Sequence, residues 1–179
     1  MPSSWATGCS TSATGFIAMA EDLAAHARAL LDANRYLTLG TVSPDGRPWT
    51  SPVYFAADGI DEFYWVSAQG AEHSRNIAHQ RWVSVVVFDS TVAPYHGRAL
   101  YAVARARALS EADVDRALEI YPGPASRGGT GLVRADVSGD SPWRMYQASA
   151  TEVSVLCPRD PGQPCGLHGS AVDHRARVS

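Results

Sequence analysis

The sequence of 179 residues contains no lysine, so all fifteen of its basic residues are arginine. Without lysine, the chain cannot form a Schiff base through a side chain, and it lacks the essential lysine of a nucleotide-binding P-loop. Any bound anion must therefore be held by arginine, by backbone N–H groups or by the N-terminus of a helix.

The sequence also lacks an excess of basic charge, because its formal net charge is -3 and its isoelectric point is about 6.0. It has no field that would attract nucleic acid or an anionic membrane surface, so we expect neither partner. No apolar run reaches the roughly 18 residues that span a bilayer. Cysteine is scarce: Cys9, Cys157 and Cys165 are odd in number and widely spread, which favours a reducing cytoplasm over a disulfide framework.

A hydrophobic content of 45% is sufficient for one buried core, so we expect a single compact domain. Residues 1–14 are interpreted as a disordered lead, 15–157 as the domain and 158–179 as a loop-like tail. Hydrophobic periodicity predicts helices over residues 16–33, 73–80 and 110–120, and strands over residues 36–42, 49–56, 63–68, 82–90, 98–109 and 150–156.

Short turns between these strands favour antiparallel pairing, and there is no βαβ alternation or GxGxxG motif. The predicted fold is therefore α+β, a mostly antiparallel six-stranded split β-barrel with short flanking helices. Pro52 removes one ladder donor, so its strand should lie at an edge or carry a bulge. The continuous apolar run at 82–88 predicts a strand buried on both faces.

The stretch 71–78, AEHSRNIA, places polar side chains where a predicted strand hands over to a predicted helix. Free N–H groups and the helix dipole favour an anion at such a junction, and Arg75 can bind a phosphate with two hydrogen bonds. The junction is a candidate phosphate site. An ordinary capped helix start with a solvated arginine explains the same residues equally well.

The order of these segments over residues 21–109 resembles the pyridoxamine 5'-phosphate oxidase-like family, the split-barrel flavin-binding proteins, and WRMYQASATEVSVL adds weaker support. The resemblance implies a homodimer that binds flavin mononucleotide (FMN) at its interface. By position, the implied isoalloxazine contacts are Trp49, Thr50, Ser51, Pro52 and Val53, and the implied phosphate contacts are Val66, Ser67, His73, Ser74, Arg75 and Asn76. Trp143 and Arg144 resemble the C-terminal aromatic and basic segment that reaches the partner's flavin, although surface packing explains them equally well.

One position departs from the family pattern, because His73 stands where members commonly carry a lysine. A neutral imidazole brings no charge, so phosphate binding would rest more on Arg75 and the hydroxyl groups. The resemblance implies an FMN-dependent oxidoreductase acting on an unidentified small molecule. The alternatives are a deazaflavin-dependent reductase and a flavin-binding or sequestering protein without turnover. Oxidation of vitamin B6 itself is disfavoured, since no second cationic site for a substrate phosphate is evident.

Two further segments contain candidate residues. Tyr95 and His96 lie in a long loop that could border a substrate opening, although a simple turn is the more economical role for each. Cys165, His168 and His174 have no recognised metal spacing, so we interpret them as part of a polar tail and expect no metal site.

Overall fold

The protein is described from a computed structural model, which covers residues 13–178, with side chains from residue 23 onward. The predicted lead therefore lies outside the described residues, apart from its last two positions. The helices are α1 (Ala13–Ala33), α2 (Glu72–His79), α3 (Glu111–Ile120) and α4 (Arg134–Val137), with a 3-10 turn at Ala125–Arg127. The strands are β1 (Tyr36–Val42), β2 (Pro48–Tyr54), β3 (Ala56–Asp58), β4 (Glu62–Ala68), β5 (Trp82–Phe88), β6 (Ala99–Ala108), β7 (Trp143–Leu156) and β8 (Arg175–Arg177).

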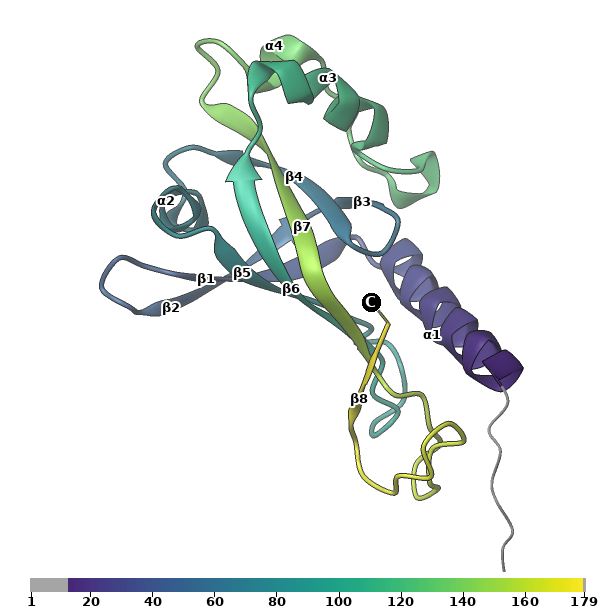
Figure 1. The fold of residues 1–179 in the computed structure, drawn as a ribbon. Helices are drawn as coiled ribbons and strands as arrows, with labels where there is room; N and C mark the ends of the chain where they lie inside the picture. The colour runs from purple at the N-terminus through teal and green to yellow at the C-terminus, as the bar shows by residue number, and fades with distance from the viewer. Residues whose placement is uncertain (1–12, 179) are drawn as a thin grey trace, which may run out of the picture.

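The strands form one curled antiparallel sheet in the order β2-β1-β5-β6-β7-β4-β3, with β8 pairing beside β7 (Figure 1). This is the predicted α+β split barrel, with eight strands in place of six. The two additional strands are three residues long, too short for alternation to reveal them. β8 also shows that the tail is not wholly loop-like, because it returns to pair with the end of β7. β2 lies at one edge of the sheet, which confirms the expectation drawn from Pro52.

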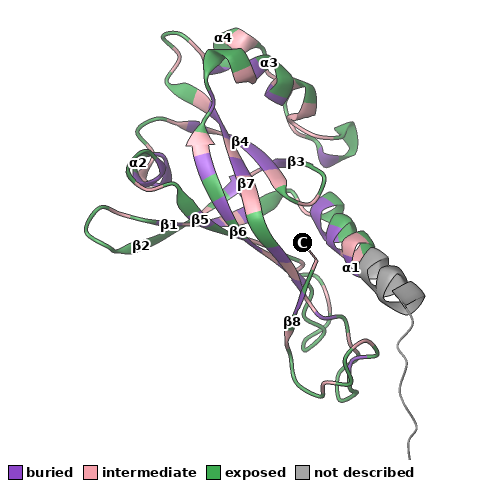
Figure 2. Cartoon of the chain, in the orientation of Figure 1, coloured by how far each residue is buried: buried purple, intermediate pink, exposed green. Residues whose placement is uncertain are grey.

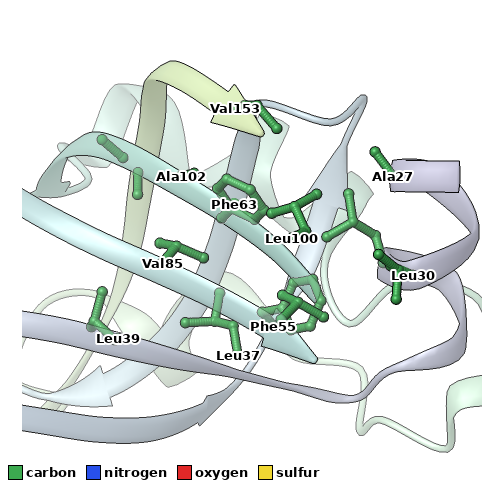
Figure 3. Packing of buried hydrophobic residues seen from close by; sticks show 14 of the residues in the cluster. Ala27, Leu30, Leu37, Leu39, Phe55, Phe63, Val85, Leu100, Ala102 and Val153 are labelled. Carbon is green, nitrogen blue, oxygen red and sulfur yellow. The ribbon is translucent and has the colours of Figure 1, made fainter. Parts of the chain in front are cut away.

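The main core fills the inside of the curled sheet. One buried cluster contains Leu37 and Leu39 of β1, Val85 of β5, Leu100 of β6 and Leu30 of α1 (Figure 3). Each such side chain contributes about 1.5–3 kcal/mol on full burial. The core thus fixes the curvature of the sheet and attaches α1 to it.

A second, smaller cluster lies between the sheet and the helices α3 and α4. Tyr64 of β4 and Met145 of β7 pack there against Val114 and Ala117 of α3 and Val137 of α4. β4 and the part of β7 that pairs with it are therefore covered on both faces, whereas Thr151 and Glu152 further along β7 are exposed. Figure 2 accordingly shows both buried and exposed colours along β7.

β5 differs from the sequence expectation. Its burial alternates, and Trp82 and Phe88 leave 43% and 52% of their surface exposed in the single chain. The apolar run therefore does not reflect burial on both faces of the strand within one chain: its inward residues enter the core and its outward residues face outside.

Candidate functional site

The junction between β4 and α2 holds a connected set of polar side chains. The Oγ of Ser67, at the end of β4, lies 2.7 Å from Nε2 of His73. The Nδ1 of the same imidazole lies 3.1 Å from Oγ of Ser51 on β2, which accepts a hydrogen bond of 3.0 Å from Nε1 of Trp49. This hydrogen-bonded chain, Trp49–Ser51–His73–Ser67, ties the edge strand β2 to the start of α2 and the end of β4.

The electrostatics of these four hydrogen-bonded side chains depend on His73, which is buried. Burial lowers the pKa of His73, because the charged imidazolium would lose hydration without gaining a carboxylate partner. The neutral ring then donates from one nitrogen and accepts at the other, which matches its two serine neighbours. His73 thus contributes a neutral polar group to the junction.

The next residues of α2 leave two polar atoms without a partner among the residues that the structure describes. Asn76 is fully buried, and its Nδ2 donates to Oγ1 of Thr41 on β1 at 3.0 Å, which fastens the helix to the sheet. Its Oδ1 has no hydrogen-bond partner, and neither does Oγ of Ser74, although both atoms are buried. Such atoms are uncommon in folded proteins and call for an explanation such as a water or ligand.

Arg75 is exposed and already has partners. Its guanidinium forms an ion pair with Glu72 and donates to the backbone carbonyl of Gly70. Glu72 is the first residue of α2, where a carboxylate takes the favourable place near the helix N-terminus. An incoming phosphate would compete with Glu72 both for the helix start and for Arg75.

The other residues predicted to bind the cofactor divide between several environments. Thr50 and Pro52 are exposed on β2, whereas Val53 is buried in the main core. Val66 precedes Ser67 on β4 and therefore points to the opposite face of the sheet, where it borders a cavity together with Trp143. Arg144 is held by its own loop, since its guanidinium donates to the carbonyls of Gly139 and Trp143 at 2.7 Å each.

Two separate hollows result from this division. One cavity, of about 400 Å³, lies beside the hydrogen-bonded chain and is lined by Ser43, Arg47, Pro48, Trp49 and Glu72. Trp143 and Val66 border a cavity of about 560 Å³ on the other side of β4. The structure thus joins Trp49, Ser51, Ser67 and His73 by hydrogen bonds. Within one polypeptide it does not bring all thirteen predicted residues to a single site.

The larger cavity contains residues that the sequence analysis did not select. Arg127 is buried beneath it, with its guanidinium carbon 4.5 Å from the ring centre of Phe55, and Tyr54 donates to the carbonyl of Pro122 at 2.8 Å. The same cavity is lined by Arg35, Tyr36, Tyr121, Gly128, Gly129, Thr130 and Leu132. Nothing local in the sequence marks these residues, since they come from four separate segments.

Of the two loop residues considered above, Tyr95 is 90% exposed and His96 lines a third cavity, of about 490 Å³. Across that cavity lie residues of the C-terminal segment, including Pro158, Arg159 and Pro164. In the same segment the structure gathers Cys157, Cys165, His168 and His174. Their spacing in the sequence gave no signal because it follows no common metal-binding pattern.

The sequence profile of the family described as pyridoxamine 5'-phosphate oxidase matches residues 23–157, most of the chain. The chain belongs to this family. A comparison with curated proteins found no match. Within residues 13–178, no helix combines the length and apolar character that crossing a membrane requires.

Solved structures share the fold of this pyridoxamine 5'-phosphate oxidase family member at low sequence identity. A heme-binding protein from Mycobacterium smegmatis is 17% identical with a TM-score of 0.61, over 87% of this chain and 58% of that one. HutZ, a heme storage protein from Vibrio cholerae, is 19% identical with a TM-score of 0.61, over 76% and 96% of the two chains. An FAD-binding protein from Mesorhizobium loti is 20% identical with a TM-score of 0.54, over 74% and 92%.

The chain spans 58% of the length of the first two structures that it matches, the mycobacterial protein and a protein from Agrobacterium tumefaciens. At these identities the likeness establishes the fold. Two of these neighbours are named for heme and one for FAD.

Proposed function

We propose that the chain binds FMN as a homodimer and uses it in an oxidoreductase reaction on a small molecule. The observation that carries this proposal is the hydrogen-bonded series Trp49–Ser51–His73–Ser67, whose His73 and Ser67 members are buried, next to the unpartnered Oγ of Ser74. A buried hydroxyl without a hydrogen bond costs about 1–3 kcal/mol, and a phosphate or ribityl oxygen would supply the missing partner.

The proposed division of labour follows from the side chains present. Hydroxyl groups of Ser67 and Ser74 would bind the ribityl phosphate end, and neutral His73 would hold Ser51 and Ser67 in place by hydrogen bonds. The exposed edge strand, with Trp49 and Thr50, would lie against the isoalloxazine ring. When bound, the flavin supplies hydride or single-electron transfer, while the protein binds it, orients it and leaves one ring face open to a substrate.

Arg75 enters this scheme through Glu72. We expect the phosphate to displace the Glu72 carboxylate from Arg75, because a phosphate offers the guanidinium two strong hydrogen bonds and carries more charge. The ion pair therefore weakens FMN binding, and the strength of this competition can be measured directly.

The arrangement around His73 favours flavin over heme at this place. Heme needs an axial ligand such as an imidazole nitrogen with a free lone pair, whereas both ring nitrogens of His73 face serine hydroxyls. A deazaflavin coenzyme, or flavin binding without turnover, is compatible with the same contacts, and experiment separates these possibilities.

The binding test compares FMN with riboflavin, which lacks the phosphate. We expect Arg75→Ala and Ser74→Ala to weaken FMN binding about tenfold or more, one lost charge-assisted contact each, while riboflavin binding changes little. Glu72→Gln should tighten FMN binding by a few-fold through the freed Arg75. Flavin fluorescence during titration of the apoprotein gives all these constants. If Arg75→Ala binds FMN as tightly as the parent, the phosphate assignment is wrong.

A second measurement separates an enzyme from a binding module. The FMN-loaded protein is mixed anaerobically with reduced nicotinamide cofactors or reduced deazaflavin, and then with quinone or enone acceptors. Reduction and reoxidation faster than those of free FMN support the oxidoreductase. If no donor and no acceptor reacts faster with the loaded protein than with free FMN, a sequestering protein is the better account. Titration with deazaflavin coenzyme and hemin, followed by absorbance, tests the other ligands.

A further inference from the structure

The C-terminal segment brings four metal-binding side chains to one point. Cys157 follows the end of β7, Cys165 and His168 lie in the loop beyond it, and His174 directly precedes β8. One ligand atom from each residue lies within 4.8 Å of all the others. Both cysteine side chains are buried, at 4% and 2% exposure. We propose that Cys157, Cys165, His168 and His174 bind one zinc ion.

Four of the six distances between the ligand atoms agree with a tetrahedral zinc site, and all six lie within 4.8 Å. With Zn–S near 2.3 Å and Zn–N near 2.0–2.1 Å, tetrahedral geometry places sulfur about 3.5 Å from nitrogen and the two nitrogens about 3.3 Å apart. The Nδ1 of His168 lies 3.4 Å from Sγ of Cys157 and 3.7 Å from Sγ of Cys165. Nε2 of His174 lies 3.6 Å from Sγ of Cys165 and 3.0 Å from Nδ1 of His168.

The surrounding backbone orients these ligands as it does around structural metals. Nδ1 of His174 lies 3.0 Å from the carbonyl of Val172; donation there leaves the Nε2 lone pair facing the cluster. The backbone N–H of His168 donates to Sγ of Cys165 at 3.2 Å, which stabilises a thiolate. Two imidazole nitrogens and two sulfurs therefore direct their lone pairs to one point, where a metal cation can bind them.

The donor set selects the metal and its role. Two thiolates and two imidazoles suit zinc, and two thiolates balance its charge after both thiol protons pass to solvent. All four tetrahedral positions are filled by protein, which is the arrangement of a structural rather than a catalytic ion. The ion would close the loop between β7 and β8, which an ion pair of 2.6 Å between Arg159 and Asp173 also braces.

The proposed ion also bears on the third cavity. Six of its lining residues lie in the stretch that the four ligands enclose: Pro158, Arg159, Asp160, Gln163, Pro164 and Gly166. Zinc would therefore fix one wall of a cavity whose other side is formed by His26 of α1 and the loop around His96.

The test uses the whole chain, purified without a polyhistidine tag, and measures bound metal by plasma mass spectrometry. We expect one zinc ion per chain in the parent and in His79→Ala, whose imidazole lies on α2 away from the cluster. His168→Ala and Cys165→Ala should bind zinc more than about tenfold more weakly in competition with a chromophoric chelator.

A donor exchange keeps the test independent of folding. His168→Cys replaces one zinc ligand by another and should retain the ion that His168→Ala loses. Cobalt in place of zinc should give the intense visible bands of a tetrahedral thiolate site in the parent and in His168→Cys. A folded parent that holds no zinc and takes up none from micromolar zinc chloride overturns the proposal, and so does a Cys157–Cys165 disulfide in the freshly purified protein.

Discussion

At the scale of single residues, His73 connects the start of α2 to two strands through one imidazole ring. Its neighbours are two hydroxyl groups and no carboxylate, so burial alone determines the direction in which its pKa moves. The side chain is therefore suited to hold serine hydroxyls in fixed orientations, and unsuited to supply positive charge to an anion at neutral pH.

This environment predicts how stability depends on pH. Because the pKa of His73 is lower in the folded chain, the unfolded chain binds more protons as the pH falls through the ordinary histidine range near 6.5. The stability contributed by neutral His73 is present above that range and is lost below it. We expect the free energy of unfolding in urea to fall between pH 7.5 and pH 5.5, less steeply in His73→Gln than in the parent.

His73→Gln should also be less stable by about 1–3 kcal/mol at pH 7.5, since it leaves buried serine hydroxyls poorly paired. The matched control is His79→Gln, on the exposed last turn of the same helix, and it should follow the parent across the pH range. An unchanged pH slope in His73→Gln would contradict the assignment of a buried neutral imidazole.

At the scale of elements, the long periodic segments were predictable from the sequence and the short ones were not. The apolar spacing of residues 16–33 and 36–42 predicted α1 and β1 closely, because each presents a full face to the core. β3 and β8 were missed since three residues carry no period, and β7 begins at Trp143 rather than near Ala150 because its pairing with β4 extends it.

The candidate site was predictable only in part, for a similar reason. Residues adjacent to one junction, Ser67 and His73, could be expected to meet, and the structure joins them. The convergence of Cys157 with His174 depends instead on how a loop closes between β7 and β8, which local sequence does not encode. Val66 and Ser67 are neighbours on β4, and alternation along the strand sends them to opposite faces, so of the two only Ser67 meets His73.

The segment after α3 gives a prediction that belongs to this scale. A Cβ at Gly129 would lie 2.3 Å from the Tyr54 hydroxyl and 2.6 Å from a carbon of Pro122, whereas a Cβ at Gly131 would meet nothing within 4 Å. Gly129→Ala must therefore displace the Tyr54 ring and its hydrogen bond, at a cost of about 1–3 kcal/mol. Gly131→Ala is the matched control and should stay within about 0.5 kcal/mol of the parent.

Thermal and urea unfolding of the two variants measure this difference. Equal stability of the two alanine variants would mean that the segment after α3 does not pack against β2 as the structure describes.

At the scale of the whole molecule, the outer face of β5 and β6 leaves large apolar side chains exposed, unlike the part of the sheet that α3 and α4 cover. Trp82 and Phe88 of β5 and Val103 of β6 expose between 43% and 52% of their surface. These three side chains lie on one face of the sheet. Trp82, Ser84 and Phe88 share a face of β5 because side chains alternate along a strand, and Val103 of β6 pairs with Ser84. Exposed large apolar side chains gathered on one sheet face are typical of an interface, and a twofold axis would let them pack against those of a second copy.

We therefore expect the protein to sediment as a dimer at micromolar concentration, through an interface of at least about 1,000 Å². Phe88→Asp would place a carboxylate in that interface and should produce a folded monomer, because an unpaired buried charge opposes association. Val133→Asp is the matched control, since Val133 is 64% exposed on the loop before α4, away from β5 and β6. If the proposed flavin site is shared between copies, FMN affinity should fall together with dimerisation in Phe88→Asp and stay unchanged in Val133→Asp. A parent protein that sediments as a monomer with FMN still bound would remove the shared site, because one chain would then suffice to hold the cofactor.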